Sequence, residues 1–227
     1  MSEIGFLWEG FLTNPPPNNQ KRKSKSKNRK NMDAMGFFKQ SEGEWRSQRS
    51  THHLAFRQAE IGDSNIQVTT LTAEDPRIIE ICEIHEVEPR RAAGGAYVTW
   101  NGSMSWDKDD ENHKGETVFA IVPDADNPKE GLMLRERGYA EIVPVAGRFV
   151  MDDEGGLVLI TEYETMSAIE RFWFPNPNVR MRSSTVKRFG GFSTSTFCTE
   201  VRVDPNSTPA QPPSEANSHQ FYSAFGW

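Results

Sequence analysis

Residues 96–106 read AYVTWNGSMSW, and this stretch decides the class of fold. Its even-numbered positions are apolar or small, whereas its odd-numbered positions are mostly polar. Because a β-strand places every second side chain on the same face, Trp100, Gly102 and Trp106 share one face of a predicted strand. In a solid core, a glycine between two indoles would leave unfilled space. Next to a flat ligand, the same space lets the ligand lie against the strand. The pattern fits a pocket wall, and it also fits the core face of an ordinary strand.

Similar β-rich runs lie on both sides of this strand, separated by turn residues such as Asp153–Gly156 and Pro175–Pro177. Many short sequential strands with few helices predict an antiparallel barrel or sandwich. Short helices are predicted at residues 34–41 and at residues 75–82, where Asp75 precedes Pro76. The predicted strands are residues 48–60, 66–71, 96–106, 117–123, 139–145, 147–152, 157–165, 169–174, 179–188 and 194–203.

Charge is distributed unevenly along the 227 residues. Seven of the 26 Lys and Arg residues fall within residues 1–30, which leaves 19 cations against 30 acids in the remainder. A domain that acidic is a poor candidate for binding nucleic acid. The two cysteines, Cys82 and Cys198, are far apart, so a zinc ribbon is excluded and a reducing compartment is expected.

Three regions follow from composition. Residues 1–33 form a basic extension that we expect to be unstructured, residues 34–204 form the domain, and residues 205–227 form a Pro- and Ser-rich tail that we also expect to be unstructured. The basic extension could anchor RNA or an acidic partner, but an extension ahead of a start at Met32 or Met35 is the favoured interpretation. The apolar patch at residues 4–8 is too short for a signal peptide or a membrane span.

Three charged residues on predicted strands carry the candidate chemistry. Alternation places Arg180, Arg182 and Ser184 on one face. Two buried guanidinium groups repel each other without anions, so they face either water or a ligand that bears carboxylates, which arginine binds in bidentate fashion. Glu170 shares an apolar face with Phe172 and Phe174, and its carboxylate therefore needs a pyrrole N–H or an arginine as partner.

Metal and nucleophile sites find little support. The adjacent His52 and His53 point to opposite sides of a strand, and the other histidines add no ligand spacing, so no metal site is predicted. Cys198 lies in a strand-like run with no base nearby in sequence, and we interpret it as a core residue.

Several segments together resemble a known family. The Gly43-Glu44-Trp45 sequence after a short helix is similar to the Gly-x-Trp signature of lipocalins. The segments WRSQRSTHHL at 45–54, YAEIVPVAGR at 139–148, TEYETM at 161–166, ERFWF at 170–174 and TVKRFGGFST at 185–194 resemble the S-type phycobiliprotein chromophore lyases, the CpcS/CpeS family of cyanobacteria and algal plastids. The resemblance covers residues 35–203.

The resemblance implies an all-β fold, a lipocalin-like, up-and-down antiparallel barrel of about ten strands with a short N-terminal helix. It also implies a lyase that attaches an open-chain tetrapyrrole, a bilin, by a thioether to a cysteine of a phycobiliprotein subunit. Glu170 and Arg180 are the implied catalytic residues, and the implied bilin-binding residues are Arg49, His52, Trp100, Trp106, Trp173, Arg182 and Ser184. Arg49 and His52 are an odd number of residues apart, as are Glu170 and Trp173, so a bulge is needed to bring all four to one face.

In this hypothesis Arg180 and Arg182 pair with the bilin propionates, Glu170 protonates the ring nitrogens, and the acceptor protein supplies the sulfur. The bilin is a transferred substrate and no permanent cofactor is expected; phycocyanobilin is slightly favoured over phycoerythrobilin. The expected partners are the bilin and the phycobiliprotein subunit, in the cyanobacterial cytoplasm or the plastid stroma, with a homodimer or a related lyase subunit left open. Two alternative functions remain from sequence. The first is a lipocalin-like bilin carrier without catalysis, and the second is a nucleic-acid-binding protein that uses its basic arm.

Overall fold

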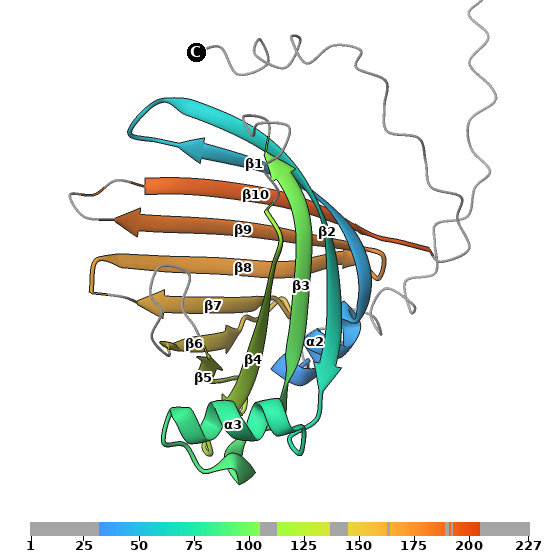
Figure 1. The fold of residues 1–227 in the computed structure, drawn as a ribbon, viewed down its shortest axis with the longest axis vertical. Coiled ribbons are helices and arrows are strands. Elements are labelled where there is room, and N and C mark those ends of the chain that lie inside the picture. Colours follow the sequence, from blue (N-terminus) through green and yellow to red (C-terminus); the bar gives the residue numbers. More distant parts are fainter. Residues whose placement is uncertain are drawn as a thin grey trace, which may run out of the picture.

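The computed structural model describes residues 32–104, 113–136, 145–162, 164–188, 191 and 193–204, and within them the chain forms one closed antiparallel barrel. Each strand pairs with its neighbours in sequence, and β1 pairs with β10 to close the cylinder (Figure 1). The strands are β1 (Gly43–His53), β2 (Gln58–Leu71), β3 (Gly94–Met104), β4 (Gly115–Pro123), β5 (Glu130–Arg135), β6 (Val145–Met151), β7 (Leu157–Glu162), β8 (Met166–Asn176), β9 (Val179–Arg188) and β10 (Ser193–Arg202). The predicted ten-stranded all-β barrel is confirmed.

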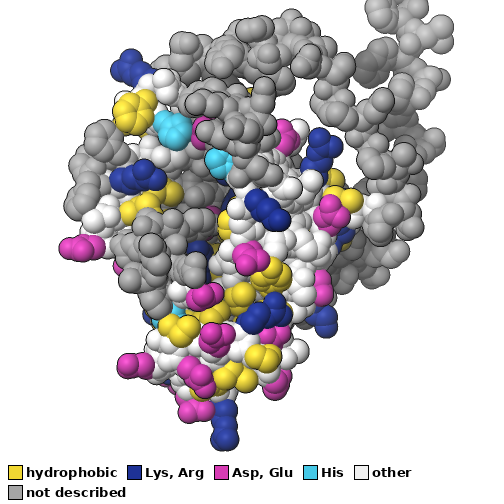
Figure 2. All heavy atoms as spheres, viewed as in Figure 1, with side chains coloured by type: hydrophobic (Ala, Val, Ile, Leu, Met, Phe, Trp, Pro, Cys, Tyr) yellow, Lys and Arg dark blue, Asp and Glu magenta, His cyan; other side chains and the backbone are white. Residues whose placement is uncertain are grey.

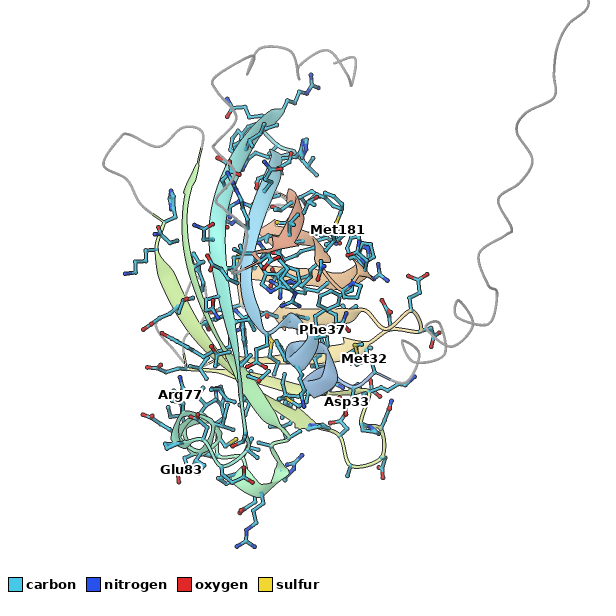
Figure 3. The ribbon with its side chains drawn as sticks, turned by 90° about the vertical axis from the view of Figure 1, so that its right-hand side faces the viewer. Met32, Asp33, Phe37, Arg77, Glu83 and Met181 are labelled. Atoms are coloured by element: carbon cyan, nitrogen blue, oxygen red, sulfur yellow. The ribbon has the colours of Figure 1, made fainter. Side chains whose placement is uncertain are left out.

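Helix α2 (Ala34–Ser41) closes one end of the barrel (Figure 3). It begins at Asp33, whose carboxylate accepts a hydrogen bond from the Gly36 backbone nitrogen at 2.7 Å, a standard way to satisfy a free N–H at a helix start. Phe37 packs on Phe174 with ring centroids 4.9 Å apart. The indole nitrogen of Trp45 donates to the Ser41 carbonyl at 2.7 Å, which ties the end of the helix to β1.

Helix α3 (Pro76–Ile84) covers the outside of the barrel over β4 and β5, and a short 3-10 turn, Pro89–Arg91, leads from it towards β3 (Figure 1). Its buried side chains pack with residues on the outer side of the wall, including Ala120 and Val122. The neighbouring Phe119 and Ile121 point into the barrel and belong to the interior core. The run of four buried residues in β4 therefore reflects a strand that is covered on both faces.

Burial changes along the barrel axis. Interior side chains near α2, such as Trp45, Ile121 and Phe149, are fully buried. Interior side chains farther along the same cylinder, such as Trp100 and Ser184, are only half-buried. The interior is thus reached from the end opposite α2, which we call the open end. None of the helices among the described residues is long and apolar enough to cross a membrane.

Two strand predictions differ from the structure. Residues 48–60 were predicted as one strand, but a tight turn at residues 54–57 divides them between β1 and β2. Strand β5 was not predicted, and residues 139–144, where a strand was predicted instead, lie outside the described residues. The predicted helices at 34–41 and 75–82 are confirmed, the second beginning with Asp75 as its N-cap.

Candidate functional site

A buried ion pair lies at the inner end of the candidate site. Arg180 on β9 and Glu200 on β10 are directly opposite each other in the strand register. The Arg180 Nε donates a hydrogen bond to the Glu200 carboxylate, and the two side chains are only 6% and 1% exposed. Burial lowers the pKa of Arg180, and the charge of Glu200 opposes that shift. The guanidinium also lies over the ring of Trp45, 4.8 Å from its centroid.

Arg182 lies one step closer to the open end and links several groups. Its Nη1 is 3.5 Å from Glu170 Oε1, and its Nε is 3.9 Å from Glu200 Oε1. Its Nη2 donates to the sulfur of Cys198 at 3.2 Å. Its side chain is 20% exposed, so of the two arginines it is the one that an incoming ligand meets first. We call Glu170, Arg180, Arg182 and Glu200 the interior cluster.

Glu170 occupies the apolar face that alternation predicted for it. The residue is 8% exposed and follows Ala168 and precedes Phe172 on the inner face of β8. Of the two partners considered from sequence, a pyrrole N–H or an arginine, the structure supplies the arginine, Arg182. Ser184 lies opposite Glu170 in the register and is half-buried on the same inner face.

The wall of the open end carries a positive charge and an indole. Arg49 on β1 alternates with the buried Ser47 and Thr51 and so faces the interior, as does Trp100 on β3, which packs against the interior core. A side chain at Gly115 would come within 2.4 Å of the Trp100 ring, so this glycine is what makes room for the indole. Gly102 was expected from sequence to make room for a ligand. In the structure its missing side chain instead makes room for Ser64 of β2, which lies close to β3 at this point.

His52 and Trp173 do not join this group. The β1 register runs without interruption through Arg49 and His52, so His52 lies on the outer face, exposed, with its ring nitrogen 3.1 Å from the Ser50 hydroxyl. Trp173 also lies on the outer face, against Phe197, and the register shift in β8 falls after it. The bulges that would have brought these two residues to the interior are absent from β1 and from β8 between Glu170 and Trp173. Trp106 lies outside the described residues.

Glu200, which is fully buried, was not among the site residues predicted from sequence. From sequence, Arg180 and Arg182 were expected to face either water or a ligand that bears carboxylates, whereas the protein itself supplies two carboxylates, Glu170 and Glu200. A sequence pattern could have identified Glu200. Within the predicted strand 194–203, alternation places Glu200 on the same face as the buried Cys198. Among the described residues no three His, Cys, Asp or Glu side chains are grouped so that they could hold a metal ion.

The fold and the cluster together define a class of protein. A β-barrel that is closed at one end, with arginines, carboxylates and an indole on its inner wall, has the architecture of a ligand-binding barrel and is suited to a flat ligand that carries anionic groups. The chain belongs to the CpeS-like family, whose model, described as CpeS-like protein, matches residues 33–203.

Known relatives cover nearly all of the domain. Chromophore lyase CpcS/CpeS 2 of Trichodesmium erythraeum is 69% identical over 196 residues, which are 86% of this chain and 100% of that protein. Phycocyanobilin lyase subunit CpcS of a Picosynechococcus species is 60% identical over 195 residues, 86% of this chain and 98% of that protein. The solved S-type phycobiliprotein lyase CPES from Guillardia theta superposes with a TM-score of 0.70 at 35% identity, covering 79% of this chain and 97% of that chain.

Proposed function

We propose that this chain is a chromophore lyase that binds a bilin in its barrel and attaches it through a thioether to a cysteine of a phycobiliprotein subunit. The observation that supports the proposal most strongly is the interior cluster on the inner wall of the barrel. Relatives that are 60% and 69% identical to this chain are named as lyases. A bilin has two propionates, a conjugated chain of pyrrole rings and an exocyclic double bond. The propionates and the ring system have matching groups on the inner wall, and the double bond is left to react with the acceptor thiol.

The propionates are matched by the arginines. Arg182 is partly exposed towards the open end, so it is placed to take a propionate in bidentate fashion. Arg180 lies deeper, at the closed end of the site, where Glu200 holds its side chain in place. Arg49 faces the same interior from β1. The indole of Trp100 offers a flat apolar surface to the ring system.

Protonation of the pigment is assigned to Glu170. A ligand with two propionates adds negative charge to the site, and this favours uptake of a proton along with the ligand. Glu170 is the better placed carboxyl group for that proton because Glu200 is buried deeper and is hydrogen-bonded by Arg180. A proton on the pyrrole nitrogens makes the conjugated system more electrophilic.

Attachment is then an addition. The acceptor thiolate forms a C–S bond to the exocyclic carbon, the π bond of that double bond breaks, and its other carbon ends with the proton that the thiol lost. No oxidant and no leaving group are required. The sulfur comes from the acceptor, and the lyase contributes by holding the pigment in a reactive orientation.

We further propose phycocyanobilin as the pigment and a phycocyanin or allophycocyanin subunit as the acceptor. The support is the relative that is named a phycocyanobilin lyase subunit and is 60% identical to this chain. Absorbance spectra of the protein incubated separately with phycocyanobilin and phycoerythrobilin test the choice, since a bound pigment shifts and sharpens its visible band. Equal or stronger binding of phycoerythrobilin would contradict it.

The test of the activity itself is reconstitution. The protein is mixed with phycocyanobilin and an apo-phycocyanin subunit, and the denatured product is examined for a fluorescent pigment that remains attached to one cysteine. A lyase accelerates this attachment and selects the cysteine. A carrier without catalysis, the second candidate, binds the pigment to the same extent but leaves the rate and site of attachment as they are without protein.

A further inference from the structure

The hairpin that joins β1 to β2 exposes an unusual amount of apolar surface. Among the described residues, seven large hydrophobic side chains are exposed, and three of them, Leu54, Phe56 and Ile61, fall within eight positions of this hairpin. Phe56 is the most exposed of the seven, at 70%, followed by Leu54 at 57%. Figure 2 shows hydrophobic, cationic and histidine side chains together at the corner of the surface where Figure 1 places this hairpin. We call Leu54 and Phe56 the hairpin tip.

Backbone hydrogen bonds hold the tip in a defined shape. The Leu54 N–H donates to the Ser193 carbonyl at 3.1 Å, which fixes the turn to the start of β10. The Phe56 N–H donates to the His53 carbonyl at 3.1 Å, and Arg57 completes the turn with a left-handed φ of 52°. The His53 ring lies 3.2 Å from the Glu60 carboxylate across the hairpin. Because these bonds already fix the backbone of the turn, the turn loses little backbone conformational freedom on binding a partner.

The position of the tip indicates what covers it. Strand β1 starts beside α2 at the closed end and runs past Trp45 and Arg49 to His53, so the tip lies on the rim of the open end. The interior cluster is reached from this end. A protein that brings a thiol to a pigment held there must lie against this rim, where the exposed side chains of Leu54 and Phe56 are available to contact it.

We propose that the hairpin tip is a docking element for the acceptor phycobiliprotein subunit, with Leu54 and Phe56 inserting into an apolar recess beside the acceptor cysteine. The inference rests on the proposed function, because the identity of the acceptor comes from that function. A second copy of this chain is the weaker occupant, because a copy seated on the tip would cover the rim and keep the acceptor thiol away from the pigment. Aromatic and aliphatic anchors at the edge of a site are the kind of residue that dominates binding at protein interfaces.

The experiment compares two double variants of the full chain loaded with phycocyanobilin. L54S/F56S removes the tip, and V201S/I84S removes two other exposed aliphatic side chains, 49% and 42% exposed, from the outside of β10 near the closed end and from α3. Affinity is measured calorimetrically against an apo-phycocyanin subunit whose acceptor cysteine is replaced by serine, so that the complex does not turn over. Attachment kinetics are measured with the unmodified subunit.

We expect L54S/F56S to weaken acceptor binding at least ~10-fold and to raise KM for the acceptor, with kcat and the absorbance of the bound pigment unchanged. V201S/I84S should match the wild type in every measurement. Unchanged acceptor affinity in L54S/F56S overturns the inference, as does a loss of self-association in that variant without loss of acceptor binding. If the wild type binds the acceptor through the tip but forms no thioether, the proposed function fails while the docking element stands.

Discussion

Arg180 and Glu200 face each other across β9 and β10 and form an ion pair from which water is almost completely excluded. Desolvation of both groups is costly, and the pair is stable only because each neutralises the other. Glu200 has a second neighbour in Arg182, 3.9 Å away. Removal of the negative charge would therefore take a counter-ion away from two neighbouring guanidinium groups in a buried site.

The first prediction follows from this pair. Glu200→Gln should lower the free energy of unfolding by about 3 kcal/mol, because it leaves the buried Arg180 charge uncompensated. The measurement is urea unfolding at pH 7. Glu154→Gln is the control: Glu154 also pairs with an arginine, Arg171, but is 81% exposed, so its loss should cost less than about 1 kcal/mol. Equal effects of the two substitutions would contradict the role given to Glu200.

Glu170→Gln separates pigment binding from transfer. The amide keeps the shape of the side chain and can still contact the pigment, but it cannot deliver a proton. We expect the absorbance titration with phycocyanobilin to give a similar affinity and the rate of attachment to fall ~100-fold. Transfer at the wild-type rate would refute the proton role while leaving the binding site intact.

Arg182→Met should weaken pigment binding ~10-fold or more, because it removes the guanidinium that is placed to take a propionate. Methionine keeps much of the apolar volume, so the barrel wall stays filled. Arg148→Met serves as control, since Arg148 is 51% exposed on the outer face and pairs there with Asp124. The two dissociation constants are obtained by spectroscopic titration, and the prediction fails if both variants bind like the wild type.

Substitution of two tryptophans tests whether the pigment contacts the inner or the outer face of the barrel wall. Trp100 faces the interior and Trp173 faces outward against Phe197. Trp100→Ala should lower pigment affinity and shift the bound absorption band, whereas Trp173→Ala should leave both unchanged. A pigment spectrum that responds to Trp173→Ala and not to Trp100→Ala would mean that the bilin lies elsewhere.

Asp152 gives a prediction for pH. Burial raises the pKa of this carboxyl, but hydrogen bonds from the Gly156 and Glu154 backbone and from Arg171 outweigh burial, so the pKa lies below its usual value. A depressed pKa adds stability that is complete above roughly pH 5 and is lost as pH falls through the folded-state pKa. Asp152→Asn should therefore cost about 1–2 kcal/mol at pH 7, and the difference should shrink below about pH 4. Urea unfolding at several pH values measures it, with the exposed Asp153→Asn as the unaffected control.

Local patterns predicted most of the fold. Strand β9 was predicted at its observed bounds and helix α2 likewise, because each has a clear period and clear ends. The β1–β2 turn was missed because Leu54-Ala55-Phe56-Arg57 contains none of the residues that usually mark a turn. Strand β5 was missed because its six residues, Glu130–Arg135, of which four are buried, do not alternate between apolar and polar types.

The candidate site was predictable from sequence only where the alternation within a single strand determines which face a residue occupies. Alternation placed Glu170 on the apolar face of its strand and placed Arg180 and Arg182 together on one face, which the structure turns inward. The partnership of Arg180 with Glu200 depends on how β9 and β10 align, which no pattern within either strand specifies. His52 and Trp173 were expected to reach the pigment through bulges, and uninterrupted strand pairing keeps them outside.

The position of α3 makes the barrel mechanically uneven. Strands β4 and β5 are pressed between the interior core and this helix, so their part of the cylinder has protein on both sides. Strand β9, which carries both arginines of the interior cluster, has no such outer layer among the described residues, and most of its side chains are partly exposed. We therefore expect the wall of β4 and β5 to be the stiffer one, and we expect the wall of β9 to be the one that adjusts when pigments of different curvature bind.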